Sequence, residues 1–98
     1  VIETVKNYIK ENYDENITLG EMAEYISFSQ YYLSKLFKEV EGINFKDYII
    51  KMRMEKAKEL LKKGQKIKEI SNSVGYSDPN YFSRAFKKYT GISPSKYV

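Results

Sequence analysis

Residues 28–43 read FSQYYLSKLFKEVEGI, and residues 76–92 read YSDPNYFSRAFKKYTGI. The two stretches share their chemistry from the first aromatic residue and Ser, through a central Phe-Lys, to a closing Gly-Ile. The offset is 48 residues through Ser29 and 49 after it, because the second copy has one extra residue at Asp78-Pro79. In both copies the apolar residues recur every three or four positions, which is the period of a helix. One turn-and-helix pattern therefore occurs twice, and it decides the fold.

The composition excludes several classes of function. The 98 residues include no Cys and no His, so the chain has no thiol nucleophile and lacks the usual ligands of zinc. No pair of titratable groups converges with a nucleophile, and we expect neither an enzyme nor a bound cofactor or metal. No apolar run approaches the roughly 18 residues of a membrane span, and the residues given contain no signal-peptide pattern. We expect a soluble, cytoplasmic fragment of a longer chain that does not contact membranes.

Charge is distributed unevenly along the chain. Residues 1–49 carry five Lys and nine acidic residues, a net charge of −4, whereas residues 50–98 carry twelve basic and four acidic residues, a net charge of +8. A basic balance favours a polyanionic partner such as nucleic acid, although Lys also simply solvates helical surfaces. Charge alone leaves both interpretations open.

Every strong period in the sequence is helical, so the predicted fold is all-α with about seven helices. The expected order is a first helix over residues 2–13, a short helix capped by Thr18 with Glu21, and a helix capped by Ser29 and stopped by Gly42. Asn44 then caps the longest helix, over residues 45–63, which ends at Gly64. The second copy repeats the scheme with a short helix near residues 67–74, a long helix capped by Ser77 or Asp78, and a last turn from Ser93-Pro94 to Tyr97.

Helical periodicity also predicts which side chains are buried in the two long helices of the repeat. The expected inward residues are Tyr32, Leu33, Leu36, Phe37 and Val40 in the first copy and Tyr81, Phe82, Ala85, Phe86 and Tyr89 in the second. In the turn before each of these helices, Gly75 can adopt a positive φ without strain, whereas the matching Ser27 is expected to be strained there.

Duplicated helix-turn-helix units suit a target that repeats in space. We predict a first lobe over residues 1–43, a linker helix over residues 44–64 and a second lobe over residues 65–98. A linker of about 19 residues is roughly 28 Å long, close to the roughly 34 Å between successive major-groove faces of B-DNA. Helical repeats also build protein-binding scaffolds, so a protein-interaction module without direct DNA reading is the alternative.

The second copy resembles the signature of a known family. Residues Ile67 to Tyr97, with Gly75-Tyr76, Tyr81-Phe82-Ser83-Arg84, Gly91 and Ser93-Pro94, are similar to the C-terminal pattern of the AraC-type (AraC/XylS) transcription regulators. Arg53, Ala57 and Leu61 are similar to that family's linker helix, and residues 18–42 to its first helix-turn-helix. The resemblance covers nearly the whole chain. Within the family it is greatest to output modules of bacterial response regulators, although sugar-sensing members end similarly.

The resemblance implies a module that inserts two helices into adjacent major grooves of a bipartite double-stranded DNA site. It also implies a full-length protein that regulates transcription, usually as an activator through RNA polymerase, and carries a sensor or receiver domain upstream. Carried over by position, the base-reading residues are Tyr31, Ser34 and Lys35 in the first lobe and Asn80, Ser83 and Arg84 in the second. The residues assigned to DNA phosphates are Gln30, Lys38, Tyr81, Lys87 and Lys88.

Several of these residues have an alternative role. Arg84 can bond a guanine edge or hold a phosphate, and Asn80 can read adenine or simply sit on the helix surface. Tyr81 and the matching Tyr32 are assigned mainly to the core, with the Tyr81 hydroxyl available to a phosphate. Asp78 is assigned to capping, and Arg53 to a salt bridge with a nearby acid.

Overall fold

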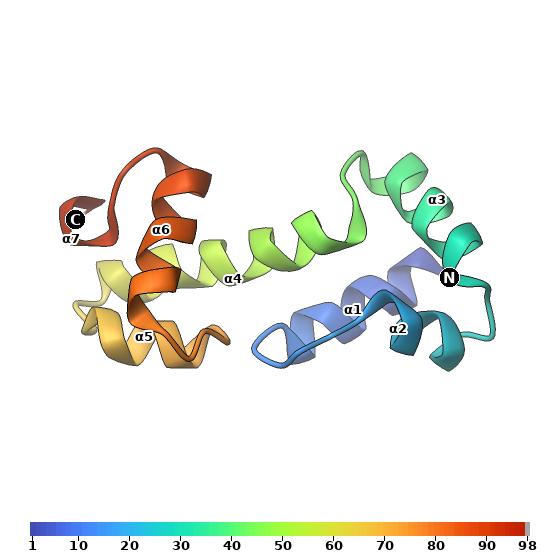
Figure 1. Ribbon diagram of the computed structural model, residues 1–98, viewed down its shortest axis with the longest axis horizontal. Coiled ribbons are helices and arrows are strands. Elements are labelled where there is room, and N and C mark those ends of the chain that lie inside the picture. The colour runs from blue at the N-terminus through green and yellow to red at the C-terminus, as the bar shows by residue number, and fades with distance from the viewer. Residues whose placement is uncertain (98) are drawn as a thin grey trace. The chain divides into compact units, whose positions relative to one another are not determined.

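The computed structural model describes residues 1–97, which contain seven helices and no strand (Figure 1). The helices are α1 (Ile2–Asn12), α2 (Leu19–Tyr25), α3 (Gln30–Glu41), α4 (Phe45–Lys62), α5 (Ile67–Ser73), α6 (Pro79–Thr90) and α7 (Pro94–Tyr97). This confirms the all-α prediction. The expected helix ends are met to within one or two residues, as is usual for termini located by capping residues.

The chain separates into two compact units, and the division falls inside α4. The first unit is Val1–Met52, and the second begins at Arg53. Helix α4 itself is continuous over 18 residues, about 27 Å at 1.5 Å per residue. Its first half therefore contributes side chains to one core and its second half to the other.

The first unit is built around Phe37 of α3, whose side chain is fully buried. Helix α3 packs against both α1 and α2. Phe45 and Tyr48, from the start of α4, form edge-to-face pairs with the Phe37 ring, with centroids 5.8 and 5.4 Å away. The core that surrounds these rings consists of Ile2, Val5, Ile9, Met22, Ala23, Leu33 and Ile49.

Phe86 of α6 is the counterpart of Phe37 in the second unit. It is also fully buried, and Tyr97 of α7 meets it edge to face with centroids 5.4 Å apart. Other buried apolar residues come from α4, α5 and α6 and from the residue that follows α5. They are Met54, Ala57, Leu60, Leu61, Ile70, Val74 and Phe82. The two units thus repeat one packing scheme, in which α7 takes the place of the first turn of α4.

The turn of each helix-turn-helix has the positive φ that the sequence predicts. Ser27 has a φ of 60° and Gly75 a φ of 100°, and Ser27 is the only residue other than Gly with a positive φ in the described part of the chain. In both turns the next residue donates a backbone hydrogen bond across the turn, from Phe28 N to Ala23 O at 2.8 Å and from Tyr76 N to Ser71 O at 2.9 Å. The second turn gains one more bond, since the buried Ser71 hydroxyl donates to Tyr76 O at 2.9 Å.

Helix caps account for most of the predicted boundaries. Thr18, Ser29 and Asn44 each accept a hydrogen bond from the backbone amide three residues later, and Asp78 accepts one from Asn80 N. Asp78, rather than Ser77, is therefore the cap of α6. Gly42 and Gly91 close α3 and α6 with φ values of 83° and 87°.

The N-terminus of α5 lacks the cap that its counterpart α2 has. Lys66 occupies this position with an extended backbone (φ −74°, ψ 144°) but makes no side-chain cap bond. Thr18 has a similar extended backbone at the start of α2, and both helices carry Glu at the third following residue, Glu21 and Glu69. The second unit thus has a capping position filled by a residue that cannot cap.

Lys66→Thr is expected to raise the free energy of unfolding by about 1 kcal/mol, because a Thr hydroxyl can accept an orphan amide of α5. The measurement is urea unfolding followed by circular dichroism. The matched control, Thr18→Ala in α2, should lower stability by a similar amount. The prediction is contradicted if Lys66→Thr leaves the urea midpoint of unfolding unchanged while Thr18→Ala lowers it.

Ion pairs and side-chain hydrogen bonds connect the ends of α3 and α6 to neighbouring helices. In the first unit Lys6 of α1 lies 3.2 Å from Glu41 of α3, and this hydrogen-bonded pairing raises the pKa of the Lys6 ammonium. In the second unit the Tyr89 hydroxyl donates to Glu55 at 3.2 Å, and Lys58 lies 2.9 Å from the same carboxylate oxygen. Burial, followed by the charge of Glu55, raises the pKa of the Tyr89 hydroxyl.

Four predicted core residues were assigned wrongly. Tyr32 and Val40 of α3 are 52% and 57% exposed, and Tyr81 and Tyr89 of α6 are 57% and 38% exposed. Tyr32 and Tyr81 lie at the border of the apolar face near the start of their helix, whereas Val40 and Tyr89 lie within that face in the last turns. Periodicity places all four on the face, but it does not show how far along the helix that face is covered by a neighbour.

Candidate nucleic-acid interface

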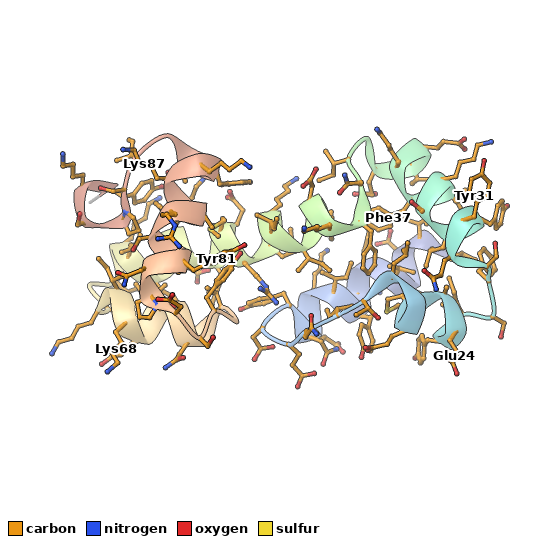
Figure 2. All side chains as sticks on the ribbon, viewed as in Figure 1. Glu24, Tyr31, Phe37, Lys68, Tyr81 and Lys87 are labelled. Carbon is orange, nitrogen blue, oxygen red and sulfur yellow. The ribbon has the colours of Figure 1, made fainter. Side chains whose placement is uncertain are left out.

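The exposed face of α3 carries the residues that the sequence assigned to DNA in the first unit. Tyr31 is 77% exposed, and Figure 2 shows it at the end of α3 nearest the turn, directed away from the buried Phe37. Gln30, Lys35 and Lys38 are also exposed, and Ser34 is half-buried. The Ser29 cap and the Leu33 and Phe37 anchors fix which face of the helix is presented.

The exposed face of α6 repeats this arrangement with more positive charge. Asn80, Arg84, Lys87 and Lys88 are exposed and Ser83 is half-buried, with Phe82 and Phe86 anchoring the opposite side. No acidic residue occurs in α6, whereas α3 ends with Glu39 and Glu41. Helix α6 is thus the more strongly cationic of the two, which suits a polyanion.

Gln30 lies at the junction of α2 and α3. A Cβ added to Gly20 in the first turn of α2 would come within 3.1 Å of Gln30 Nε2, so the Gln30 amide sits against the backbone of α2. The Gln30 side chain therefore packs on the first turn of α2, next to Gly20.

Aromatic rings support the exposed faces at the start of each helix. Phe28 in the first turn stacks on Tyr32 of α3 with centroids 5.3 Å apart, and Tyr76 in the second turn stacks on Tyr81 of α6 at 5.8 Å. The misassigned Tyr32 and Tyr81 therefore pack on the turn rather than in the core.

Two arginines extend the aromatic pair of the second unit. The Arg53 guanidinium lies over the Tyr76 ring, 5.0 Å from its centroid, and the Arg84 guanidinium lies over the Tyr81 ring at 5.9 Å. Neither contact was predicted from the sequence. The three-residue spacing of Tyr81 and Arg84, which places them on the same side of one helix, is the signal in the sequence for the second contact.

The described residues hold few other features that suggest a ligand. Within residues 1–97 no group of three or more acidic side chains is placed to hold a metal ion. In the part of the chain that the structure describes, no helix is long and apolar enough to cross a membrane. The candidate residues lie on the exposed face of α3 in the first unit and on that of α6 in the second.

Comparison with known proteins identifies relatives of the whole chain. Residues 22–98 match the family model described as "Helix-turn-helix domain". The Msm operon regulatory protein of Streptococcus mutans is 39% identical over 97 residues, covering 98% of this chain and 35% of that protein. This chain spans about a third of the length of the curated relatives that it matches.

Two solved structures share both the fold and much of the sequence. The C-terminal domain of AraT, a response regulator from Geobacillus stearothermophilus, is 41% identical with a TM-score of 0.92, over 98% of this chain and 81% of that one. The C-terminal domain of the two-component response regulator yesN from Fusobacterium nucleatum is 44% identical with a TM-score of 0.90, over 97% and 94% of the two chains.

Proposed function

The chain belongs to the AraC-type helix-turn-helix family, the DNA-binding output domain of transcriptional regulators, and on that premise we propose that it reads duplex DNA with α3 and α6. The observation that carries this proposal is the repeated presentation of the two helices. Each follows a positive-φ turn, starts at a side-chain cap, is anchored by a buried Phe and exposes a polar face. A B-DNA major groove admits one α-helix and displays a distinct pattern of donors and acceptors for every base pair.

Base reading is assigned to the first half of each exposed face. Asn80 can bond adenine N6 and N7, Arg84 can bond guanine O6 and N7 in a fork, and Ser83 can bond either purine. In the first unit, Tyr31 can contact a thymine methyl, while Ser34 and Lys35 supply polar contacts. These six residues lie near the N-terminal ends of their helices, the part that usually contacts base edges.

Phosphate binding is assigned to the flanking residues. Lys87 and Lys88 lie in the last turn of α6 and Lys38 in the last turn of α3, where a long side chain can reach the sugar-phosphate backbone. Gln30 and the Tyr81 hydroxyl are assigned to phosphates at the other end of each helix. Their supporting observations are the contact of Gln30 with α2 and the exposure of Tyr81.

The two lobes, joined by α4 as a linker, are proposed to occupy a bipartite site of roughly 15 to 20 base pairs with two short motifs about one helical turn apart. Duplication of the whole packing scheme supports this, since each unit presents one equivalent helix. In the cell, this module would act in the cytoplasm as part of a longer bacterial regulator with an upstream sensor or receiver domain. We propose activation through RNA polymerase as its mode of action.

The test of these assignments compares Asn80→Ala with Lys87→Ala on α6. Asn80→Ala should weaken binding to the preferred duplex by about 1 to 3 kcal/mol and spare random duplex, because a base-edge contact exists only at the right sequence. Lys87→Ala should weaken both duplexes and reduce the slope of log affinity against log salt by about 0.9, since one phosphate contact is lost. Affinities are measured by fluorescence anisotropy, after selection of the preferred site from a random library.

Lys68→Ala on α5 is the matched control, because it also removes one positive charge from an exposed Lys, but at a position outside the proposed face. A uniform loss for Asn80→Ala, with selectivity intact and the helix still folded by circular dichroism, would show that α6 is only an electrostatic anchor. A salt slope near zero for the unmodified chain would instead indicate a protein partner.

A further inference from the structure

The second unit contains a continuous stack of four side chains that reaches the proposed DNA-binding face. The order is Arg53, Tyr76, Tyr81 and Arg84, with a cation over a ring at each end and a ring pair in the middle. The successive separations are 5.0, 5.8 and 5.9 Å. The stack joins α4, the turn and α6, so an exposed side chain on α6 is connected to groups held by the core of the unit.

Each inner member of the stack is fixed by the fold. Tyr76 follows the Gly75 turn, donates its amide to Ser71 O, and accepts the buried Ser71 hydroxyl at its carbonyl. Its ring also lies 5.7 Å from the fully buried Phe82. Tyr81 is 57% exposed, but its ring rests on Tyr76 at an interplanar angle of 33°. The ring beneath Arg84 is therefore held at a defined place before any DNA binds.

Contact with the ring leaves the Arg84 donors available. The attraction between a guanidinium and a ring face is electrostatic and needs none of the five N–H groups of Arg as hydrogen-bond donors. The donors that recognise guanine or a phosphate oxygen are therefore not used by the ring contact, in which the Arg84 guanidinium lies 5.9 Å from the Tyr81 centroid. Contact with Tyr81 restricts the side chain and is compatible with contact to DNA.

In the first unit, the residues at the matching positions do not form such a stack. Tyr32 occupies the position that matches Tyr81 and rests on Phe28 at 5.3 Å, but the residue that matches Arg84 is Lys35. In the described part of the chain Lys35 makes no cation–ring contact with Tyr32, whereas Arg84 makes one with Tyr81. The same ring pair therefore supports an ordered cation in one unit only.

We propose that Tyr81 is a positioning residue, whose ring, backed by Tyr76 and Arg53, preorganises the Arg84 guanidinium for its contact with DNA. This role rests on the proposed function of α6 and differs from the phosphate contact assigned to the Tyr81 hydroxyl. Holding Arg84 in place lowers the entropy lost on binding, so the ring raises affinity through Arg84 rather than through a contact of its own.

The test is a double-mutant cycle between Tyr81→Leu and Arg84→Ala, with Tyr81→Phe as the variant that keeps the ring and removes the hydroxyl. Tyr81→Leu should bind the preferred duplex about two- to fivefold more weakly than Tyr81→Phe, the range expected for an exposed cation–ring contact. In the Arg84→Ala background Tyr81→Leu and Tyr81→Phe should bind equally, because both lack the hydroxyl and no guanidinium is left to position. Tyr81→Phe alone should lose only its hydroxyl contact, by the same factor with and without Arg84, and Tyr32→Leu in α3, the matched control, should also lose equal affinity in both backgrounds.

A second measurement needs no DNA. In the free protein the Arg84 Nε–H resonance should carry a ring-current shift that Tyr81→Leu abolishes and Tyr81→Phe retains. Equal losses for Tyr81→Leu in both backgrounds, tighter binding of Tyr81→Leu, or an Arg84 resonance that Tyr81→Leu does not move would each overturn the positioning role. If Tyr81→Phe binds as weakly as Tyr81→Leu, the hydroxyl is the functional group and the positioning role is also overturned. If Arg84→Ala leaves affinity unchanged, the assignment of Arg84 to DNA fails instead, whatever the free-state resonance shows.

Discussion

Insertion of five base pairs between the two motifs of the preferred site is expected to weaken binding about 100-fold or more. The insertion rotates one motif to the opposite side of the duplex, so α3 and α6 of one chain can no longer enter their grooves together. The affinity that remains is that of a single unit, and the loss of simultaneous engagement is typically worth two to four orders of magnitude. Binding is measured by gel shift and by anisotropy on matched duplexes.

A ten-base-pair insertion distinguishes one chain from two. It restores the rotational phase but adds about 34 Å, more than the roughly 27 Å of α4. A single chain that reads both motifs should bind this duplex as weakly as the five-base-pair variant. Recovery with ten base pairs would indicate two cooperating chains, and unchanged affinity with five would remove the two-groove model.

Phe86→Ala is expected to lower the free energy of unfolding by about 3 to 5 kcal/mol, a large share of the stability of a small domain. Phe86 is fully buried between Phe82 and Tyr97, so its removal leaves a cavity that the flanking rings cannot fill without moving. Phe37→Ala should have an effect of the same size in the first unit, where Tyr48 takes the place of Tyr97. Chemical denaturation gives the magnitude, and amide exchange shows which unit opens.

Val40→Ala is the control for these substitutions, because Val40 lies on α3 near Phe37 but is 57% exposed. It should change stability by no more than about 0.5 kcal/mol. The packing argument fails if Phe86→Ala is no more destabilising than Val40→Ala. It also fails if Phe86→Ala accelerates exchange mainly in the first unit.

Much of the fold was determined by the sequence, because the signals that set it act over a few residues. Thr18, Ser29 and Asn44 cap an amide three residues away, and Gly91 ends a helix through its own backbone. The unusual conformation of Ser27 was also predicted, since the matching Gly75 marked the position of a positive φ. The duplicated pattern then indicated that Phe37 and Phe86 would be equivalent centres of packing.

The tertiary structure decided which residues at the border of each apolar face are covered. Periodicity assigns Tyr32 and Tyr81 to the apolar face, but burial also requires a neighbouring element that covers them, and the fold leaves the two side chains 52% and 57% exposed. Those rings instead lie on the turn residues Phe28 and Tyr76, where they support the exposed face. The contact of Arg53 with Tyr76 likewise depends on how α4 packs against the turn, because the two residues are distant in sequence. Local chemistry therefore determined the helices and their ends, whereas the stack that carries Arg84 exists only through packing between elements that no short-range pattern specifies.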